Sequence, residues 1–302
     1  MQRVKPLSSS KKIMKNCLCC AFIFLASCII FLVVAEIMLN KVQFVKDRYE
    51  HIRDPEPFRS SLNKQGFRVL SGDIVYKEKP GDYFRIICLG DSFTFGHGVG
   101  DNETYPIFLE GYLENSYNIK NQVINAGIMG TTITQQTDMY KNSVTQLGHD
   151  LVLILFNDND FEDLAMNFLY KEKQWNTDGD IFDRRLKKFK ICLLIEHHIE
   201  RERARYACEE YYNQHREKFN SQYFNKLKML NDMVKSNKAT LVVVIFRSGE
   251  DLKDFCIDQH IRVIDISEDY CRLAREKDIC LVYHHNELGN KLLAKLIADR
   301  LF

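Results

Sequence analysis

The sequence lacks any marked excess of charge. Its 42 Lys and Arg residues nearly balance its 41 Asp and Glu residues, so the net charge is +1. Without a basic excess, nothing in the composition indicates nucleic acid or another polyanion as a partner. Internal repeats and low-complexity tracts are absent as well. Apolar residues make up 45% of the 302-residue chain and charged residues 27%, which is typical of a folded globular protein.

Regular cysteine spacing is also missing. Of the 10 cysteines, those at positions 17, 19, 20 and 28 lie in an apolar run and behave as small apolar residues. The other six are irregularly spaced and fit no zinc pattern. Nothing else in the sequence implies a metal or organic cofactor. Cys88 and Cys280 lie in apolar runs and are expected to be buried free thiols. Whether any of the six form disulfides stays open.

The N-terminus contains an uncharged apolar run over residues 17–35. About 20 such residues in a helix cross the hydrocarbon core of a bilayer. The basic residues that precede the run are Arg3, Lys5, Lys11, Lys12 and Lys15. By the positive-inside rule, we expect residues 1–40 to be a cytoplasmic tail and transmembrane anchor. The protein would then be a single-pass protein of the inner membrane, with its main domain on the periplasmic side.

Two other interpretations of this run compete with the anchor. A cleaved signal peptide would have a shorter apolar region and a small-residue cleavage site. A lipoprotein signal would use Leu25-Ala26-Ser27-Cys28, with Cys28 as the acylated residue. The residues after Cys28 stay strongly apolar, however, and the length of the run favours the uncleaved anchor.

Beyond the anchor, residues 41–80 are polar, contain three prolines and show little periodicity, so they are expected to form a stalk or lead-in. Short apolar runs then recur through residues 81–302. Their β-branched composition is typical of strands that are buried on both faces. The five runs lie at residues 84–89, 123–126, 151–156, 241–246 and 261–264.

Helical periodicity lies between these runs, at residues 224–234 and again at 288–301. Strands that alternate with helices predict an α/β fold, in which a parallel sheet of about five strands lies between two helical layers. Residues 161–222 interrupt the alternation with many charged and aromatic residues. We expect a helical insertion there, after the third strand, either with ordinary solvated faces or as a cap that shapes substrate choice.

Polar motifs follow the first three runs, where the carboxyl ends of parallel strands form ligand sites. Gly90-Asp91-Ser92 follows the first, Asn125-Ala126-Gly127 leads to Gly130 after the second, and Asn157-Asp158-Asn159-Asp160 follows the third. A serine at such a turn is exposed to substrate, a glycine lets the backbone approach closely, and an asparagine amide can donate to an oxyanion. Each motif alone also fits a capped turn.

A histidine pair, His284 and His285, opens the last predicted helix. A histidine there could act as a general base toward a serine. Alone it would fit a surface histidine at a helix start. The four motifs together, in this order and at these places, predict a nucleophilic serine site.

With these motifs the chain resembles the SGNH hydrolases, also called GDSL esterases or lipases, and in particular the bacterial branch with an N-terminal membrane segment. KPGDYFRIICLGDSFTFGHGV and ETYPIFLE extend the likeness beyond the Gly-Asp-Ser tripeptide. The resemblance covers roughly residues 60–160 and 240–302. It implies a flavodoxin-like three-layer α/β/α sandwich.

The resemblance also implies roles for individual residues. Ser92 is similar to the family nucleophile, and its amide would be one oxyanion donor. Gly130 would supply a second amide, and the Asn159 side chain a third donor, with Asn157 as the fallback. The spacing to Gly289 matches His284 to the family base.

The family acid is missing from its usual place before the histidine, where this chain has Leu281 and Val282. Three outcomes stay open. Ser92 and His284 work as a dyad, with a carbonyl orienting the ring. Alternatively, a distant acid substitutes, with Asp278, Asp265 and Glu287 as candidates. In the third, the protein catalyses poorly or not at all.

The function implied is that of a membrane-anchored serine esterase or deacylase, acting on O-acyl (acetyl) esters of envelope glycans or on small acylated molecules. One alternative is an O-acyltransferase that uses the same serine on a glycan. The other is a degenerate SGNH domain that binds glycan within an assembly. Only the fate of the acyl-enzyme separates hydrolysis from transfer.

Overall fold

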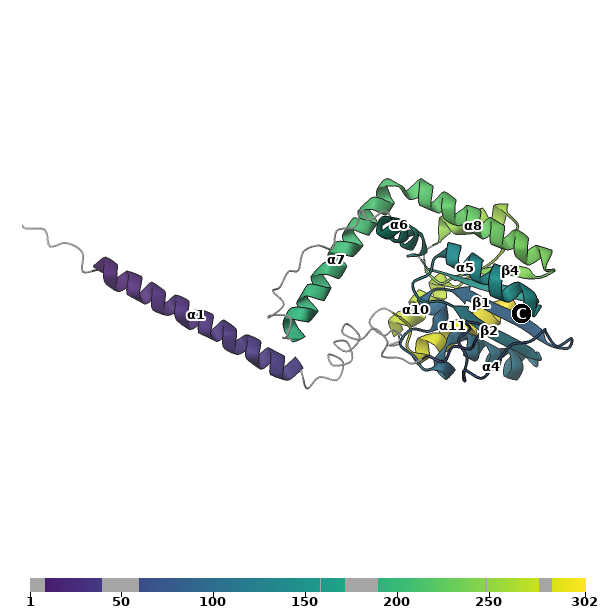
Figure 1. Ribbon diagram of the computed structural model, residues 1–302, viewed down its shortest axis with the longest axis horizontal. Helices are drawn as coiled ribbons and strands as arrows, with labels where there is room; N and C mark the ends of the chain where they lie inside the picture. The colour runs from purple at the N-terminus through teal and green to yellow at the C-terminus, as the bar shows by residue number, and fades with distance from the viewer. Residues whose placement is uncertain (1–8, 40–59, 158, 172–189, 248, 277–283) are drawn as a thin grey trace, which may run out of the picture. The chain divides into compact units, whose positions relative to one another are not determined.

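The computed structural model describes residues 9–39, 60–157, 159–171, 190–247, 249–276 and 284–302 (Figure 1). The chain divides into two compact units. One comprises Met1–Pro57 with Asn176–Ala204, and the other comprises Phe58–Trp175 with Arg205–Phe302. The helices and strands are α1 (Ser9–Leu39), β1 (Phe84–Gly90), α3 (Ser92–Phe95), α4 (Tyr105–Tyr117), β2 (Asn121–Gly127), α5 (Ile133–Met139), β3 (Leu151–Phe156), α6 (Asp160–Lys171), α7 (Lys190–Gln214), α8 (Arg216–Ser236), β4 (Thr240–Ile245), α9 (Glu250–Asp258), β5 (Arg262–Asp265), α10 (Ser267–Glu276) and α11 (Glu287–Leu301).

The five strands form one parallel sheet in the order β2-β1-β3-β4-β5. Each lies on one of the five apolar runs, so the predicted parallel sheet is confirmed. β1 lies between β2 and β3, and its last residue, Gly90, is in register with Gly127 at the end of β2. The turns that follow these three neighbouring strands therefore emerge side by side from one edge of the sheet.

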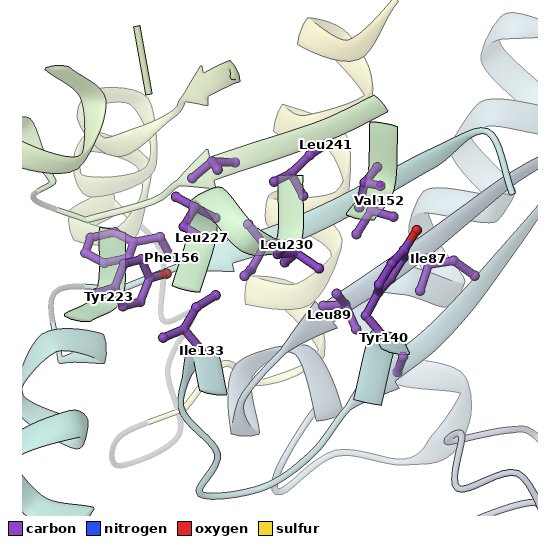
Figure 2. Close-up of a cluster of buried hydrophobic side chains, with 14 of the residues drawn as sticks. Ile87, Leu89, Ile133, Tyr140, Val152, Phe156, Tyr223, Leu227, Leu230 and Leu241 are labelled. Atoms are coloured by element: carbon purple, nitrogen blue, oxygen red, sulfur yellow. The ribbon is translucent and has the colours of Figure 1, made fainter. Parts of the chain in front are cut away.

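Helices cover both faces of the sheet. On one face α5, α8 and α9 bury a cluster that includes Ile87, Leu89, Val152, Leu227 and Leu230, and Figure 2 shows the α8 side chains packing toward the strands. On the other face α4, α10 and α11 pack against Ile86, Cys88 and Leu153. Figure 1 shows α5 and α8 on the opposite side of the strands from α4 and α11. Continuous apolar strands thus have both faces buried, as their composition predicts.

Part of the segment predicted as a stalk belongs to this sheet unit. Phe67 and Val69 are buried in the core, and Arg68 pairs with Asn125 of β2 through an isolated antiparallel bridge. The Asn63 side chain accepts hydrogen bonds from the amides of Gln65 and Phe67, which closes a tight turn. Residues 60–69 therefore contribute to the fold, although their polar sequence gives no periodic signal.

α1 is a helix of 31 residues with many exposed apolar side chains, among them Phe22, Ile23 and Phe31. Over the described ranges of the chain, no helix combines the length and the apolar character that crossing a membrane requires. The transmembrane anchor predicted for residues 1–40 stays a prediction.

The predicted insertion, residues 161–222, is helical where it is described, and parts of it belong to the sheet unit. α6 packs on the sheet unit through Phe161, Leu164 and Ala165, and the end of α7 adds Cys208 and Tyr212 to the same core. α8 starts within the predicted range and continues to Ser236, directly before β4. α8 is thus the crossover helix of the sheet. A cap over the site stays a prediction.

Cys88, Cys208 and Cys256 are buried free thiols, which confirms the prediction for Cys88. Burial raises the pKa of each of these three thiols to about 12, so they stay protonated. Cys280, predicted to be buried, lies outside the described residues.

Candidate active site

Ser92 is the first residue of α3, directly after β1. Asp91 caps this short helix, because its Oδ1 accepts a hydrogen bond from the amide of Phe93 at 2.9 Å. Phe93, Thr94 and Phe95 are buried, whereas Ser92 is only partly buried. The turn thus fixes its apolar side chains in the core and leaves the serine at the surface.

His284 lies three residues before the first residue of α11, Glu287. Asn286 caps that helix by accepting a hydrogen bond from the amide of Gly289 at 2.9 Å. The Nε2 atom of His284 is 2.8 Å from the Oγ atom of Ser92. The fold thus brings together two predicted site residues that are 192 positions apart. This distance is suited to proton transfer between the hydroxyl and the imidazole.

Buried polar contacts connect the elements that present these two residues. The Oδ1 atom of Asn290 in α11 accepts a hydrogen bond from the amide of Tyr105, the first residue of α4. The Tyr105 hydroxyl in turn lies 3.4 Å from the Thr94 hydroxyl of α3. The Phe93 ring lies beside both histidine rings, with centroids 5.0 Å apart in each case. Since these groups are buried, α3 and α11 are held in one relative position.

His285 has very different surroundings from His284. Its ring is buried beside Phe93, Phe246 and Tyr270, and its Nε2 atom lies 2.5 Å from the Tyr270 hydroxyl. Burial, followed by the charges of Arg247 and His284, lowers the pKa of His285 to about 3. A ring that stays neutral and buried cannot exchange protons with a substrate, so the geometry favours His284 over His285 as a base.

Gly130 and Asn159 lie in the turns that follow β2 and β3, the neighbours of β1 in the sheet. Gly130 has φ of +65°, a conformation that favours glycine, and a Cβ built there would have open space around it. Its backbone is exposed to an approaching ligand. Burial and, after it, the charge of Asp91 raise the pKa of Asp163, in the first turn of α6. The turn containing Asn159 therefore lies within electrostatic range of the serine turn.

The asparagine turn forms a chain of side-chain hydrogen bonds. Asn157, which is buried, donates from Nδ2 to Oδ1 of Asn159. Asn159 donates from its own Nδ2 to Oδ2 of Asp163 at 2.8 Å. The backbone amide of Asn157 donates to Oδ2 of Asp160 at 2.7 Å. Because Asn157 is buried and Asn159 is more exposed, the geometry favours Asn159 as the donor that can reach a ligand.

The position of the missing acid, at Leu281 and Val282, lies outside the described residues, as does Asp278. The other two candidate acids have partners of their own. The Asp265 carboxylate accepts from Lys253 at 2.8 Å and from the Ser267 hydroxyl at 2.6 Å. Glu287 forms an ion pair with Lys291. These contacts give no support to either residue as the group that orients His284.

The structure adds one aromatic neighbour that the sequence did not indicate. The His97 ring packs edge-on against His284, with ring centroids 4.9 Å apart. The sequence could have indicated this neighbour, because His97 follows Gly96 in the turn after α3 and is therefore close to Ser92 along the chain. In the part of the chain that the structure describes, no group of three or more His, Cys, Asp or Glu residues is arranged to hold a metal ion.

A model of the family described as GDSL-like Lipase/Acylhydrolase matches residues 86–297, which is more than two thirds of the chain. No curated protein matches the sequence. Among solved structures, this chain matches the acetyl xylan esterase AlAXEase, with 14% identity, TM-score 0.45, and coverage of 72% of this chain and 100% of that one. A catalytic mutant of Axe2, an acetylxylan esterase from Geobacillus stearothermophilus, has 14% identity, TM-score 0.47, and coverage of 74% and 96%. LAE5, an α/β hydrolase enzyme from the metagenome of Lake Arreo, Spain, has 13% identity, TM-score 0.46, and coverage of 72% and 97%.

Proposed function

Because this chain belongs to the GDSL-like lipase/acylhydrolase family, we propose that it hydrolyses carboxylic esters, with Ser92 as the nucleophile and His284 as the general base. The observation that supports these roles best is the 2.8 Å separation of the Ser92 Oγ and His284 Nε2 atoms. Serine attacks a carbonyl only when a base can accept its proton, and this distance allows the transfer.

The proposed reaction has two stages. His284 takes the proton of Ser92 while Oγ attacks the ester carbonyl, and the alcohol leaves with a proton returned from the imidazolium. Water then attacks the acyl-enzyme with His284 again as the base, which releases the acid and restores Ser92. We assign stabilisation of the tetrahedral oxyanion to the amides of Ser92 and Gly130 and to the Asn159 side chain.

As the substrate class, we propose O-acyl, above all O-acetyl, esters of envelope glycans. Its support is the sequence resemblance to exported SGNH hydrolases. An acyltransferase would use the same first stage and pass the acyl group to a sugar hydroxyl in place of water. Acetate released from an acetylated polysaccharide, with no acetyl group gained by an added unacetylated glycan, would favour hydrolysis.

The test of the proposed function is a kinetic comparison of the full chain with Ser92→Ala and His284→Ala on 4-nitrophenyl acetate. We expect each substitution to lower kcat by roughly 10³-fold or more, since nucleophile and base act as one unit. Matched unfolding curves would show that all three proteins are folded. Equal rates in the wild type and Ser92→Ala would contradict the proposal.

We also propose that the chain is held at the inner membrane with the hydrolase unit on the periplasmic side. The uncharged run at residues 17–35 and the basic residues before it support this location. Cell fractionation, followed by protease treatment of spheroplasts, would test it. Recovery of the protein in the cytosolic fraction would contradict the proposal.

A further inference from the structure

The Asp163 carboxyl lies in the first turns of α6, four residues after Asn159. The Asp163 amide donates to the Asn159 carbonyl at 2.8 Å, which is an ordinary helical contact. The Asp163 side chain makes a different contact, because its Oδ2 accepts from Nδ2 of Asn159 at 2.8 Å. The carboxyl therefore holds the carboxamide itself, and not only the backbone of the turn.

Both ends of the Asn159 carboxamide are fixed. Its Oδ1 accepts from Nδ2 of Asn157, and its Nδ2 donates one hydrogen to Asp163. A primary amide has two N–H donors, and among the described residues Asp163 is the acceptor bonded to Nδ2 of Asn159, so the second N–H can be offered to a ligand. A carboxamide that is held at both ends cannot rotate by half a turn and present its oxygen in place of its nitrogen. Such a rotation would direct a negative oxygen at a developing oxyanion.

Asp160 provides a contrast on the same turn. Its carboxylate accepts from the backbone amide of Asn157, which is the ordinary role of an acidic residue at a helix start. Burial and then the charge of Asp91 raise the pKa of Asp163 to about 7. A carboxyl kept in surroundings that disfavour its charged form is a common feature of functional sites. In either protonation state one carboxyl oxygen can still accept the Asn159 N–H.

We propose that Asp163 is a positioning residue, which fixes the Asn159 carboxamide so that its free N–H is directed at the oxyanion. This inference rests on the proposed function, in which Asn159 is an oxyanion donor. Asp163 would touch neither substrate nor nucleophile and would act through Asn159 alone. Its loss should therefore lower kcat with little change in KM, because a donor that acts in the transition state contributes little to ground-state binding.

A double-mutant cycle on the full chain tests the proposal, with Asn159→Ala, Asp163→Ala and the double variant assayed on 4-nitrophenyl acetate. Removing one oxyanion donor lowers kcat by about 10² to 10³-fold. We expect Asp163→Ala to lower kcat by roughly tenfold or more, a part of the effect of losing the donor itself. In the Asn159→Ala background, Asp163→Ala should change kcat by less than about twofold, because the group it positions is gone.

Two further variants separate positioning from a general effect on the fold. Asp163→Asn keeps an acceptor oxygen at the same place and should stay within about fivefold of wild-type kcat. Glu162→Ala removes a carboxylate from the same helical turn and should leave kcat unchanged. Unfolding midpoints would be measured for every variant. If Asp163→Ala does not fold, Asp163→Leu, which removes the acceptor oxygens and keeps a similar side-chain volume, and its combination with Asn159→Ala complete the cycle.

Losses from Asp163→Ala and Asn159→Ala that multiply in the double variant would overturn the inference, as would full activity of Asn159→Ala. In both cases the loss of activity in Ser92→Ala would leave the proposed function standing. If Ser92→Ala kept wild-type activity, the proposed function and this inference would fall together.

Discussion

His284 and His285 are neighbours in the sequence, yet their rings meet opposite conditions. The His284 ring faces the Ser92 hydroxyl at 2.8 Å, and the His285 ring is buried against Tyr270 and Phe246. Both residues are histidines, so only the path of the chain before α11 decides which ring can exchange a proton. The consequence for His285 is thermodynamic, because a buried neutral ring resists protonation.

The pH dependence of stability should therefore include a contribution from His285. Its pKa is about 3 in the folded protein and about 6.5 in an unfolded chain. Between these two pH values the unfolded state therefore binds more protons than the folded state. The contribution of His285 to the free energy of unfolding is fully present above about pH 6.5 and is lost as the pH falls toward about 3. Lowering the pH from 7 to 5 should reduce the free energy of unfolding by about 2 kcal/mol through this residue. Urea unfolding of wild type and His285→Gln at both pH values measures the difference.

The expected result is a smaller loss of stability at pH 5 in His285→Gln, whatever its stability at pH 7. Other titrating groups act alike in both proteins and cancel in the comparison. Parallel loss of stability in the two proteins would show that the His285 ring is protonated in the native state.

At the scale of elements, α3 is too short to hold itself in place, and its neighbours fix it. The Arg68 guanidinium donates to the carbonyl oxygens of Phe95, Gly96 and Val99, and it forms an ion pair with Asp101. On the other side the end of β2 lies against α3, where a Cβ on Gly127 would be 2.3 Å from the Phe95 amide nitrogen. The serine turn therefore depends on a close backbone approach that only glycine permits.

Gly127→Ala should consequently displace α3 and affect both stability and catalysis. Overpacking against backbone costs about 2 kcal/mol, and a displacement of about 1 Å in a catalytic group can cost about 10²-fold in rate. We expect a lower unfolding midpoint and a kcat at least tenfold lower on 4-nitrophenyl acetate. Gly111→Ala in α4 is the matched control. Its nearest contact would be 3.9 Å away, and a helix gains about 0.5–1 kcal/mol from this change. Wild-type kcat in Gly127→Ala would show that α3 does not depend on this contact.

At the scale of the whole molecule, the sequence predicted the sheet and the edge at which the candidate site lies, because both follow from local patterns. Continuous β-branched runs identify strands buried on both faces, and the polar turns after them mark the edge where Ser92, Gly130 and Asn159 lie. Contacts between distant segments left no such signal. The carbonyl groups that Arg68 contacts belong to residues about 30 positions later in the chain. The segment that contains Arg68 has no periodicity that would have indicated these contacts. Asp163 could have been noticed, since it follows Asn159 by one helical turn, but an acidic residue there also fits an ordinary helix start.

The start of the hydrolase unit gives the last prediction. The sequence places the domain boundary at residue 81, whereas the compact unit of the structure begins at Phe58 and includes buried Phe67 and Arg68. A chain that begins at Phe58 should therefore unfold cooperatively and keep the proposed esterase activity. A chain that begins at Gly81 should lose both, because removal of the Phe67 side chain alone costs about 3–5 kcal/mol.

Phe67→Ala in the full chain makes the same test without truncation, and Leu62→Ala is its control, because the Leu62 side chain is 51% exposed. Urea unfolding should show a large loss of stability for Phe67→Ala and little change for Leu62→Ala. Phe67 is fully buried in the core, so removal of its side chain leaves a cavity. The Leu62 side chain is already in contact with water, so its removal leaves none. Equal stability of the chains that begin at Phe58 and Gly81 would mean that residues 60–69 only cover a sheet unit that folds without them.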